Sequence, residues 1–106
     1  MPKYLLKVSY TADGVKGVLK DGGSARKRAA EAAVKSTGAS LESMYFAFGD
    51  DDVYCIIDGP DNASMAAASM AIGASGLVTA KTVVLLTPEE IDQAAKKSVS
   101  YTPPGR

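Results

Sequence analysis

Apolar and polar side chains alternate along residues 4–10, which is the pattern of a β-strand with one buried face. The alternation gives two sides, with Tyr4, Leu6, Val8 and Tyr10 on one and Leu5, Lys7 and Ser9 on the other. Residues 11–14, Thr-Ala-Asp-Gly, are expected to form the turn that ends the strand. The segment therefore predicts a first strand whose apolar side faces the protein core.

Three further segments are predicted as strands. Residues 41–48 are rich in aromatic side chains, and residues 53–57 follow after a short glycine and aspartate segment, 49–52. Two strands separated by so short a segment form a hairpin. The fourth strand covers residues 77–86 and ends in the apolar run Val-Val-Leu-Leu.

Two helical segments are predicted between the first two strands. Residues 15–20 indicate only a short helical piece, because Gly22 and Gly23 interrupt it. Residues 25–35 are dense in Ala, Arg, Lys and Glu, which favour helix. Ser24 is the expected N-cap of this second helix.

Two more helices are predicted in the second half of the chain. Residues 63–74 are rich in Ala and Met, and Asp61 or Asn62 would cap their first turn. Residues 88–97 begin with Pro-Glu-Glu directly after Thr87, which combines a cap, a proline in the first turn and acids at the positive end of the helix.

The predicted order is βαββαβ followed by a short C-terminal helix, which is a ferredoxin-like α+β fold. Its four strands would form an antiparallel sheet with the helices on one face. The other face carries side chains too apolar and too aromatic to be left in water, so we expect it to pair with the sheet of a second copy. Residues 1–97 are expected to form this single domain, and residues 98–106 a flexible tail.

Charge and composition exclude several classes of function. The 106 residues carry 12 basic and 12 acidic side chains, so the net charge of zero provides no long-range field for nucleic acid or an anionic membrane. No stretch reaches the roughly 20 apolar residues of a membrane helix. The single cysteine, Cys55, fits a reducing compartment, so we expect a cytoplasmic protein.

Histidine is absent from the chain. Neither a Ser-His or Cys-His nucleophile pair nor a His-ligated zinc, iron or haem site can therefore be built from it. One cysteine also cannot form a multi-cysteine metal cage. We expect no cofactor and no metal, and any proton transfer would fall to carboxylates, lysines, tyrosines, the cysteine or the substrate itself.

Several short motifs occur in a characteristic order along nearly the whole chain outside the tail. They are Pro2-Lys3-Tyr4, residues 11–16, Gly38, the glycine-acid turn 49–52, Pro60-Asp61 and the strand 82–87 leading into Pro88-Glu89-Glu90. In this order and spacing the chain resembles the GYD domain family of small bacterial proteins. The resemblance implies the dimeric α/β-barrel architecture, in which two sheets face each other, and it implies no particular reaction.

One position departs from the family pattern. The family is named for a Gly-x-Tyr-Asp turn, and the turn here reads Gly49-Asp50-Asp51-Asp52. Gly49 and Asp52 match the pattern, whereas Asp51 stands where the tyrosine is expected. A ligand or catalytic role carried by that tyrosine would be missing from this chain.

Six side chains are candidates for binding a small molecule between two sheets: Lys7, Ser9, Tyr45, Asp52, Tyr54 and Lys81. A lysine on a covered sheet face would attract an anionic ligand or an acidic neighbour, unless its stem packs and its amine reaches water. The tyrosines could line a pocket or pack in the core or an interface together with Phe46 and Phe48. Asp52 begins a strand, where it could cap the turn or point between the sheets.

Three other features are more typical of structure than of function. The acids at 50–52 have the chemistry for Ca²⁺ or Mg²⁺, but three consecutive residues do not converge easily on one ion, so a solvated turn is favoured. Cys55 lies in the middle of a strand and predicts a buried, inert thiol. A solvated basic helix surface, not a nucleic-acid site, is predicted for Lys20, Arg26, Lys27, Arg28 and Lys35.

Three functions are compatible with these observations. The favoured one is a non-catalytic domain that associates with itself, as a homodimer or a higher oligomer, and binds a small molecule between subunits. The second is a cofactor-independent enzyme that uses carboxylate and lysine chemistry in a cavity between the sheets, with Asp52, Lys7 and Tyr54 as first candidates. The third is a metabolite-sensing module that acts through a separate partner. The missing catalytic side chains favour the first.

Overall fold

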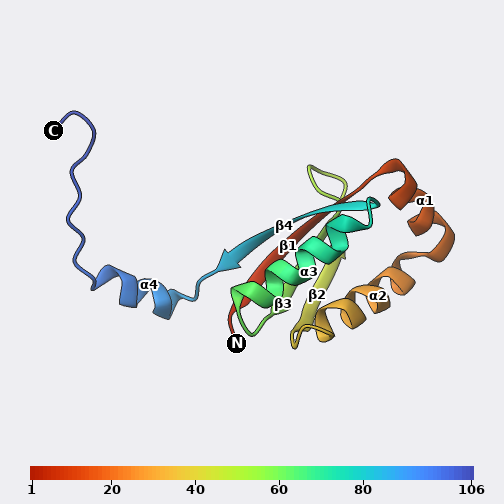
Figure 1. The fold of residues 1–106 in the computed structure, drawn as a ribbon, viewed down its shortest axis with the longest axis horizontal. Helices are drawn as coiled ribbons and strands as arrows, with labels where there is room; N and C mark the ends of the chain where they lie inside the picture. Colours follow the sequence, from red (N-terminus) through yellow and green to blue (C-terminus); the bar gives the residue numbers. More distant parts are fainter.

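A computed structural model describes all 106 residues and contains four strands and four helices (Figure 1). The elements are β1 (Lys3–Tyr10), α1 (Ala12–Asp21), α2 (Gly23–Lys35), β2 (Ser40–Phe46), β3 (Val53–Asp58), α3 (Asn62–Ala74), β4 (Val78–Leu85) and α4 (Pro88–Ala95). The strands form one antiparallel sheet in the order β2-β3-β1-β4. The predicted α+β class and ferredoxin-like arrangement are confirmed, and both helical segments predicted for the first connection are helices, α1 and α2.

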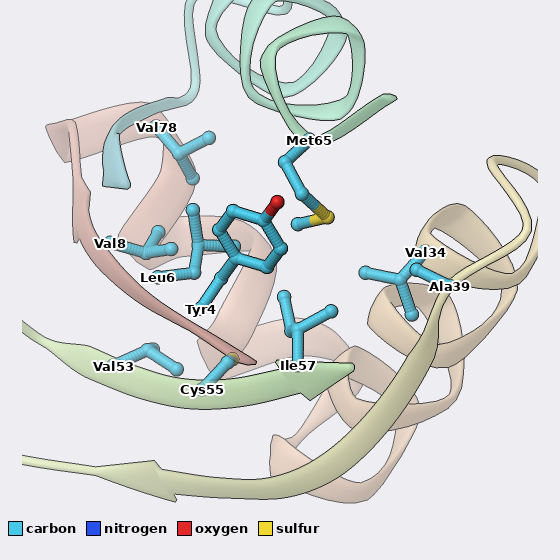
Figure 2. Close-up of a cluster of buried hydrophobic side chains, with 10 residues drawn as sticks. All are labelled: Tyr4, Leu6, Val8, Val34, Ala39, Val53, Cys55, Ile57, Met65 and Val78. Carbon is cyan, nitrogen blue, oxygen red and sulfur yellow. The ribbon is translucent and has the colours of Figure 1, made fainter. Parts of the chain in front are cut away.

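The helices α2 and α3 pack on one face of the sheet, which we call the helix face. Between them and the strands lies a cluster of ten buried side chains (Figure 2): Tyr4, Leu6, Val8, Val34, Ala39, Val53, Cys55, Ile57, Met65 and Val78. The alternation of β1 and β3 supplies six of them, because every second residue of a strand points to the same side. The hydroxyl of Tyr4, the largest of these side chains, donates a hydrogen bond to Oδ1 of Asn62 at 2.7 Å.

No helix of the chain packs on the opposite side of the sheet, called the open face below. The strand register identifies its residues, since partners in an antiparallel pair point to the same side. Leu5 pairs with Ile56 on β3 and with Val83 on β4, and Leu5 and Ile56 each lie between two buried residues of the helix face. The open face therefore carries aliphatic side chains, as the sequence predicted.

The helix α1 begins earlier than the sequence predicted. Residues 11–14 were expected to form a turn, but Thr11 is an N-cap whose hydroxyl oxygen accepts a hydrogen bond from the Gly14 amide at 3.2 Å. The Thr11 amide and hydroxyl also donate to the Leu77 carbonyl oxygen at 2.9 and 3.1 Å. A threonine cap followed by Asp13 in the first turn suits a helix start as well as a turn, and this tie to the start of β4 selects the helix.

Two other boundaries also differ from the prediction. The cap of α2 is Gly22 and not Ser24, because Gly22 adopts a positive φ of 82° and the helix already begins at Gly23. The glycine pair thus separates α1 from α2 as predicted. The strand β2 ends at Phe46, which leaves the side chain of Phe48 fully exposed beyond it.

The C-terminal segment leaves the body of the protein after β4 (Figure 1). The predicted cap of α4 is confirmed as a capping box, in which Thr87 and Glu90 each accept a hydrogen bond from the other's amide, and Pro88 is the first residue of the helix. The helix ends at Ala95, two residues before the predicted end, and every residue of α4 is exposed. No helix of the structure is long and apolar enough to cross a membrane.

Candidate ligand site on the open sheet face

One row of polar side chains crosses the open face of the sheet. Tyr45 of β2 pairs with Tyr54 of β3, Tyr54 pairs with Lys7 of β1, and Lys7 pairs with Lys81 of β4. Ser9 lies two residues after Lys7 on the same side of β1. Five of the six residues predicted as ligand-binding candidates are thus brought together from four different strands.

A buried carboxylate lies beside this row. Asp51 is only 4% exposed, although the sequence predicted a solvated turn. Its Oδ1 accepts a hydrogen bond from the Ser9 hydroxyl at 2.9 Å and lies 3.7 Å from Nζ of Lys81. A buried carboxylate is costly without such partners, so the serine and the lysine account for its position.

The neighbouring Asp52 has a different role in the turn. Its carboxylate accepts a hydrogen bond from the Tyr10 amide at 2.8 Å, and its own amide donates to the Val8 carbonyl oxygen at 2.8 Å. Asp52 therefore fastens the turn to the end of β1, which is the first of the two roles predicted for it. The acid that reaches the side-chain row is Asp51, which was not among the predicted ligand-binding residues.

Asp51 was missed because the period-two pattern of β3 does not continue into the turn. Counted back from the buried Val53, Asp51 would point to the helix face and Asp52 to the open face. The regular pairing of β1 with β3 ends at Val53, however, and the hydrogen bond from Ser9 places Asp51 on the opposite side. The signal present in the sequence was chemical, because lysines on one sheet face need an acidic neighbour.

The electrostatic balance of the row favours an anion. Two lysines and one aspartate leave one positive charge, and Lys7 and Lys81 lie directly opposite each other, which is unfavourable for like charges. Of these two lysines, only Lys81 forms an ion pair, with Asp51. An anion between the two ammonium groups would relieve their repulsion and neutralise the remaining positive charge of the row.

A third basic side chain on the open face, Lys3, is neutralised by two acids. Lys3, at the other end of β1, lies 2.8 Å from Asp58 and 3.2 Å from Glu42. The hydrogen bond to Asp58, followed by that to Glu42, raises the pKa of the Lys3 amine above its usual range. Lys3 therefore joins three strands and offers no free charge to a ligand, in contrast to Lys7.

The aromatic side chains near the hairpin do not form one group. Tyr45 and Tyr54 belong to the open face, whereas the Phe46 ring approaches Gly23 at the start of α2 and Phe48 points into water. Of these four aromatic side chains, only the two tyrosines can therefore offer hydroxyl groups to a ligand on this face.

Two further expectations concern the chemistry of the chain. Cys55 is buried as predicted, and burial raises the pKa of its thiol to about 11, so the thiol stays protonated and unreactive at neutral pH. The acids at 50–52 belong to no cluster of three or more side chains that could hold a metal ion. The carboxylates of Asp51 and Asp52 are instead held by protein hydrogen bonds.

Comparison with known protein families gives a match to the GYD domain over residues 4–95. The chain belongs to the GYD domain family. Comparisons with curated proteins and with solved structures gave no significant match. In this GYD domain the matched region runs from β1 to the end of α4, and it contains the whole open-face row and the turn with Asp51.

Proposed function

We propose that this GYD domain associates with itself through the open faces of two copies, and that the two sheets enclose a site for a small anionic molecule. The observation that supports this most directly is the row of two tyrosines and two lysines beside the buried Asp51. These side chains come from four strands and a turn, yet they converge on the one sheet face that no helix covers. Ligand sites are typically lined by apolar side chains with a few polar groups among them, and this face has that composition.

The aliphatic side chains around the row favour a second copy as the cover. The open face also carries four aliphatic side chains, those of Leu5, Ile56, Val83 and Leu85. The side chain of Val83 is 39% exposed in a single copy. Two sheets that stack face to face pack about 10 Å apart, which would remove these side chains from water. A domain of 106 residues also gains stability from such an additional apolar interface.

The symmetry of such a pair makes an anionic ligand favourable. A two-fold interface brings the same patch of both copies together, so the net positive charge of one row would lie against the net positive charge of the other. Ammonium groups buried without a counter-charge are unfavourable. A carboxylate or phosphate between the sheets would accept hydrogen bonds from Lys7, Lys81 and the tyrosine hydroxyls.

The enzyme alternative has a weaker basis. Its expected base, Asp52, is occupied by the Tyr10 amide, while Asp51 is held by Ser9 and Lys81. Binding requires only the charges and donors that the row already presents. The metabolite-sensing alternative uses the same binding site and adds a separate partner protein.

Self-association is tested by light scattering of the full chain at micromolar concentration, where we expect a dimer or a higher oligomer. Val83→Asp places a charge on the open face and should give a monomer, because it would bury an unpaired acid. Leu19→Asp is the matched control, since Leu19 is 81% exposed on α1, and it should leave the association unchanged. A monomeric wild-type chain, or a Val83→Asp variant that still associates, would contradict the proposal.

Anion binding is tested by calorimetric titration with inorganic phosphate, citrate and benzoate as probes. At least one probe should bind, and Lys7→Ala or Lys81→Ala should each weaken its affinity about tenfold, the effect of losing one charged hydrogen bond. Lys20→Ala on α1 serves as the control for a general loss of charge. Equal affinities in all variants would show that the anion binds elsewhere.

A further inference from the structure

The carboxylate of Asp51 has one oxygen without a partner. The hydrogen bond from Ser9 and the ion pair with Lys81 both involve Oδ1, and no hydrogen bond or ion pair of the structure involves Oδ2. Among residues that are not exposed, no fully buried polar side-chain atom lacks a partner, so Oδ2 must reach the surface, although Asp51 as a whole is buried. The small exposed part of Asp51 therefore includes an unused acceptor.

This free oxygen lies beside the two lysines of the open-face row. The other oxygen of the same carboxylate contacts Ser9 and Lys81, whose side chains both lie on the open face. Ser9 follows Lys7 by two residues, which is about 7 Å along β1, and Lys81 pairs with Lys7 across the sheet. One negatively charged acceptor and two ammonium groups are therefore within reach of a single small molecule.

An anion without a hydrogen-bond donor would be both attracted and repelled at this place. Lys7 takes part in none of the ion pairs of the structure, so its charge attracts an anion. The carboxylate of Asp51 repels the same anion, and a second sheet above the site would reduce the screening by water. A ligand with an O–H or N–H group next to its anionic group would replace this repulsion with a charge-assisted hydrogen bond to Oδ2.

We propose that the open-face site selects anions that carry a hydrogen-bond donor of their own. Lys7 and Lys81 bind the anionic group, and Oδ2 of Asp51 accepts the hydrogen bond from the donor. Hydroxy acids and hydrogen phosphate have this chemistry, whereas sulfate and carboxylates without a hydroxyl group do not. This inference rests on the proposed anion site and names its ligand class, with Asp51 as the residue that determines specificity.

The wild-type chain tests this selectivity with pairs of probes that differ in a single donor. Phosphate and sulfate are tetrahedral anions of similar size, but only phosphate keeps a proton at pH 7. Citrate and tricarballylate are both tricarboxylates, but only citrate has a hydroxyl group. In each pair that binds, calorimetric titration at matched ionic strength should give an affinity at least about tenfold higher for the member with the donor, the effect of one hydrogen bond to a charged group.

The results with these probes separate the selectivity from the proposed function. Equal affinities within a pair that binds, or tighter binding of sulfate or tricarballylate, would overturn the selectivity and leave the anion site intact. Binding of benzoate without any of the four probes would have the same consequence, because benzoate carries no donor. If none of these anions binds, both the anion site and its selectivity are wrong.

Asp51→Asn tests whether this residue carries the selectivity. If the asparagine oxygen keeps the hydrogen bond from Ser9, its NH₂ group presents donors where the acceptor Oδ2 was. Sulfate and tricarballylate should then bind several-fold more tightly, because the repulsion is lost, and the preference within each pair should fall below about threefold. Asp50→Asn, an exposed position of the same turn with the same loss of charge, is the matched control and should keep the preference.

A purely structural role of Asp51 would give a different result. If its carboxylate only neutralises Lys81, Asp51→Asn should change the affinities of both members of a pair by the same factor and keep the preference. That result, or an equal loss of preference in Asp50→Asn, would overturn the role assigned to Asp51. The comparison of probes on the wild-type chain does not depend on how well the variant folds, so it can disprove the selectivity by itself.

Discussion

Two adjacent aspartates in the turn before β3 show how much a single residue's position depends on its backbone neighbours. Asp52 bonds to the Tyr10 amide and holds the turn, while Asp51 lies buried against Ser9 and Lys81. Both are acids in the same short run, yet only one reaches the open-face row. Their difference follows from the place where the ladder between β1 and β3 ends.

A prediction at the residue scale concerns Gly14 in the first turn of α1. A methyl group on Gly14 would collide with the Leu77 carbonyl oxygen, which already accepts two hydrogen bonds from Thr11. Because a backbone atom cannot move aside as a flexible side chain can, Gly14→Ala should lower the free energy of unfolding by about 2 kcal/mol. Urea denaturation measures this loss.

Gly17, in the same helix, provides the matched control. A methyl group there would meet no atom within 4 Å, so Gly17→Ala should raise the free energy of unfolding by up to about 1 kcal/mol through its higher helix propensity. Equal changes in the two variants would show that close contact with Leu77 does not decide the effect.

Periodicity was sufficient to place most of the candidate site. The alternation of β1 put Lys7 and Ser9 on one face, and the hairpin and the fourth strand brought Tyr54 and Lys81 beside them. The position of Asp51 could not be predicted in this way, because it depends on a turn whose hydrogen bonds come from β1, more than 40 positions earlier in the chain.

At the scale of elements, the sequence predicted the strands and their order more accurately than the helix starts. Each strand begins and ends within two residues of its predicted bounds, because period-two burial is a strong signal. The start of α1 was hidden, since Thr11 and Gly14 suit a turn as well as a helix. The choice depends on a hydrogen bond to Leu77, a residue that local patterns cannot identify.

The two threonine caps, Thr11 and Thr87, give a prediction at this scale. Thr11 caps α1 and bonds to Leu77, whereas Thr87 caps α4, which packs on nothing in its own chain. At concentrations where the chain is monomeric, Thr11→Ala should therefore lower the free energy of unfolding by about 1 kcal/mol. Thr87→Ala should change it by less than about 0.5 kcal/mol.

Thermal denaturation of both variants, with Thr11→Ser as the conservative control, distinguishes the two roles. Serine retains the capping oxygen and should restore most of the loss. An equal loss of stability on replacing Thr87 would mean that α4 packs on its own domain, which would contradict the exposed C-terminal arm, residues 86–106.

At the scale of the whole molecule, apolar side chains remain exposed on the open face of the sheet and along the C-terminal arm, residues 86–106. The open face presents Val83 and its neighbours, and the arm, which carries Leu86 and Ile91, extends from the end of β4 (Figure 1). A single copy cannot cover these surfaces with its own residues. A second copy could cover the open face, which is why self-association is proposed.

The stability of the fold should also depend on pH through Cys55, one of the buried side chains of the core cluster (Figure 2). Burial raises the pKa of the thiol from 9.0 to about 11, because the thiolate is poorly solvated among apolar side chains. Below pH 9 the thiol is protonated in both states, and its contribution to stability is fully present. Between pH 9 and about 11 it ionises in the unfolded chain only, so the free energy of unfolding should fall.

The chain carries other ionisable groups, so the comparison must isolate the thiol. Cys55→Ala removes the thiol and leaves the other groups in place, at a packing cost that does not change with pH. Urea denaturation of both proteins between pH 8 and pH 11 should show the wild type losing stability faster than the variant above pH 9. Parallel curves for the two proteins would show that the thiolate is tolerated in the folded core. Cys55 would then not couple folding to pH.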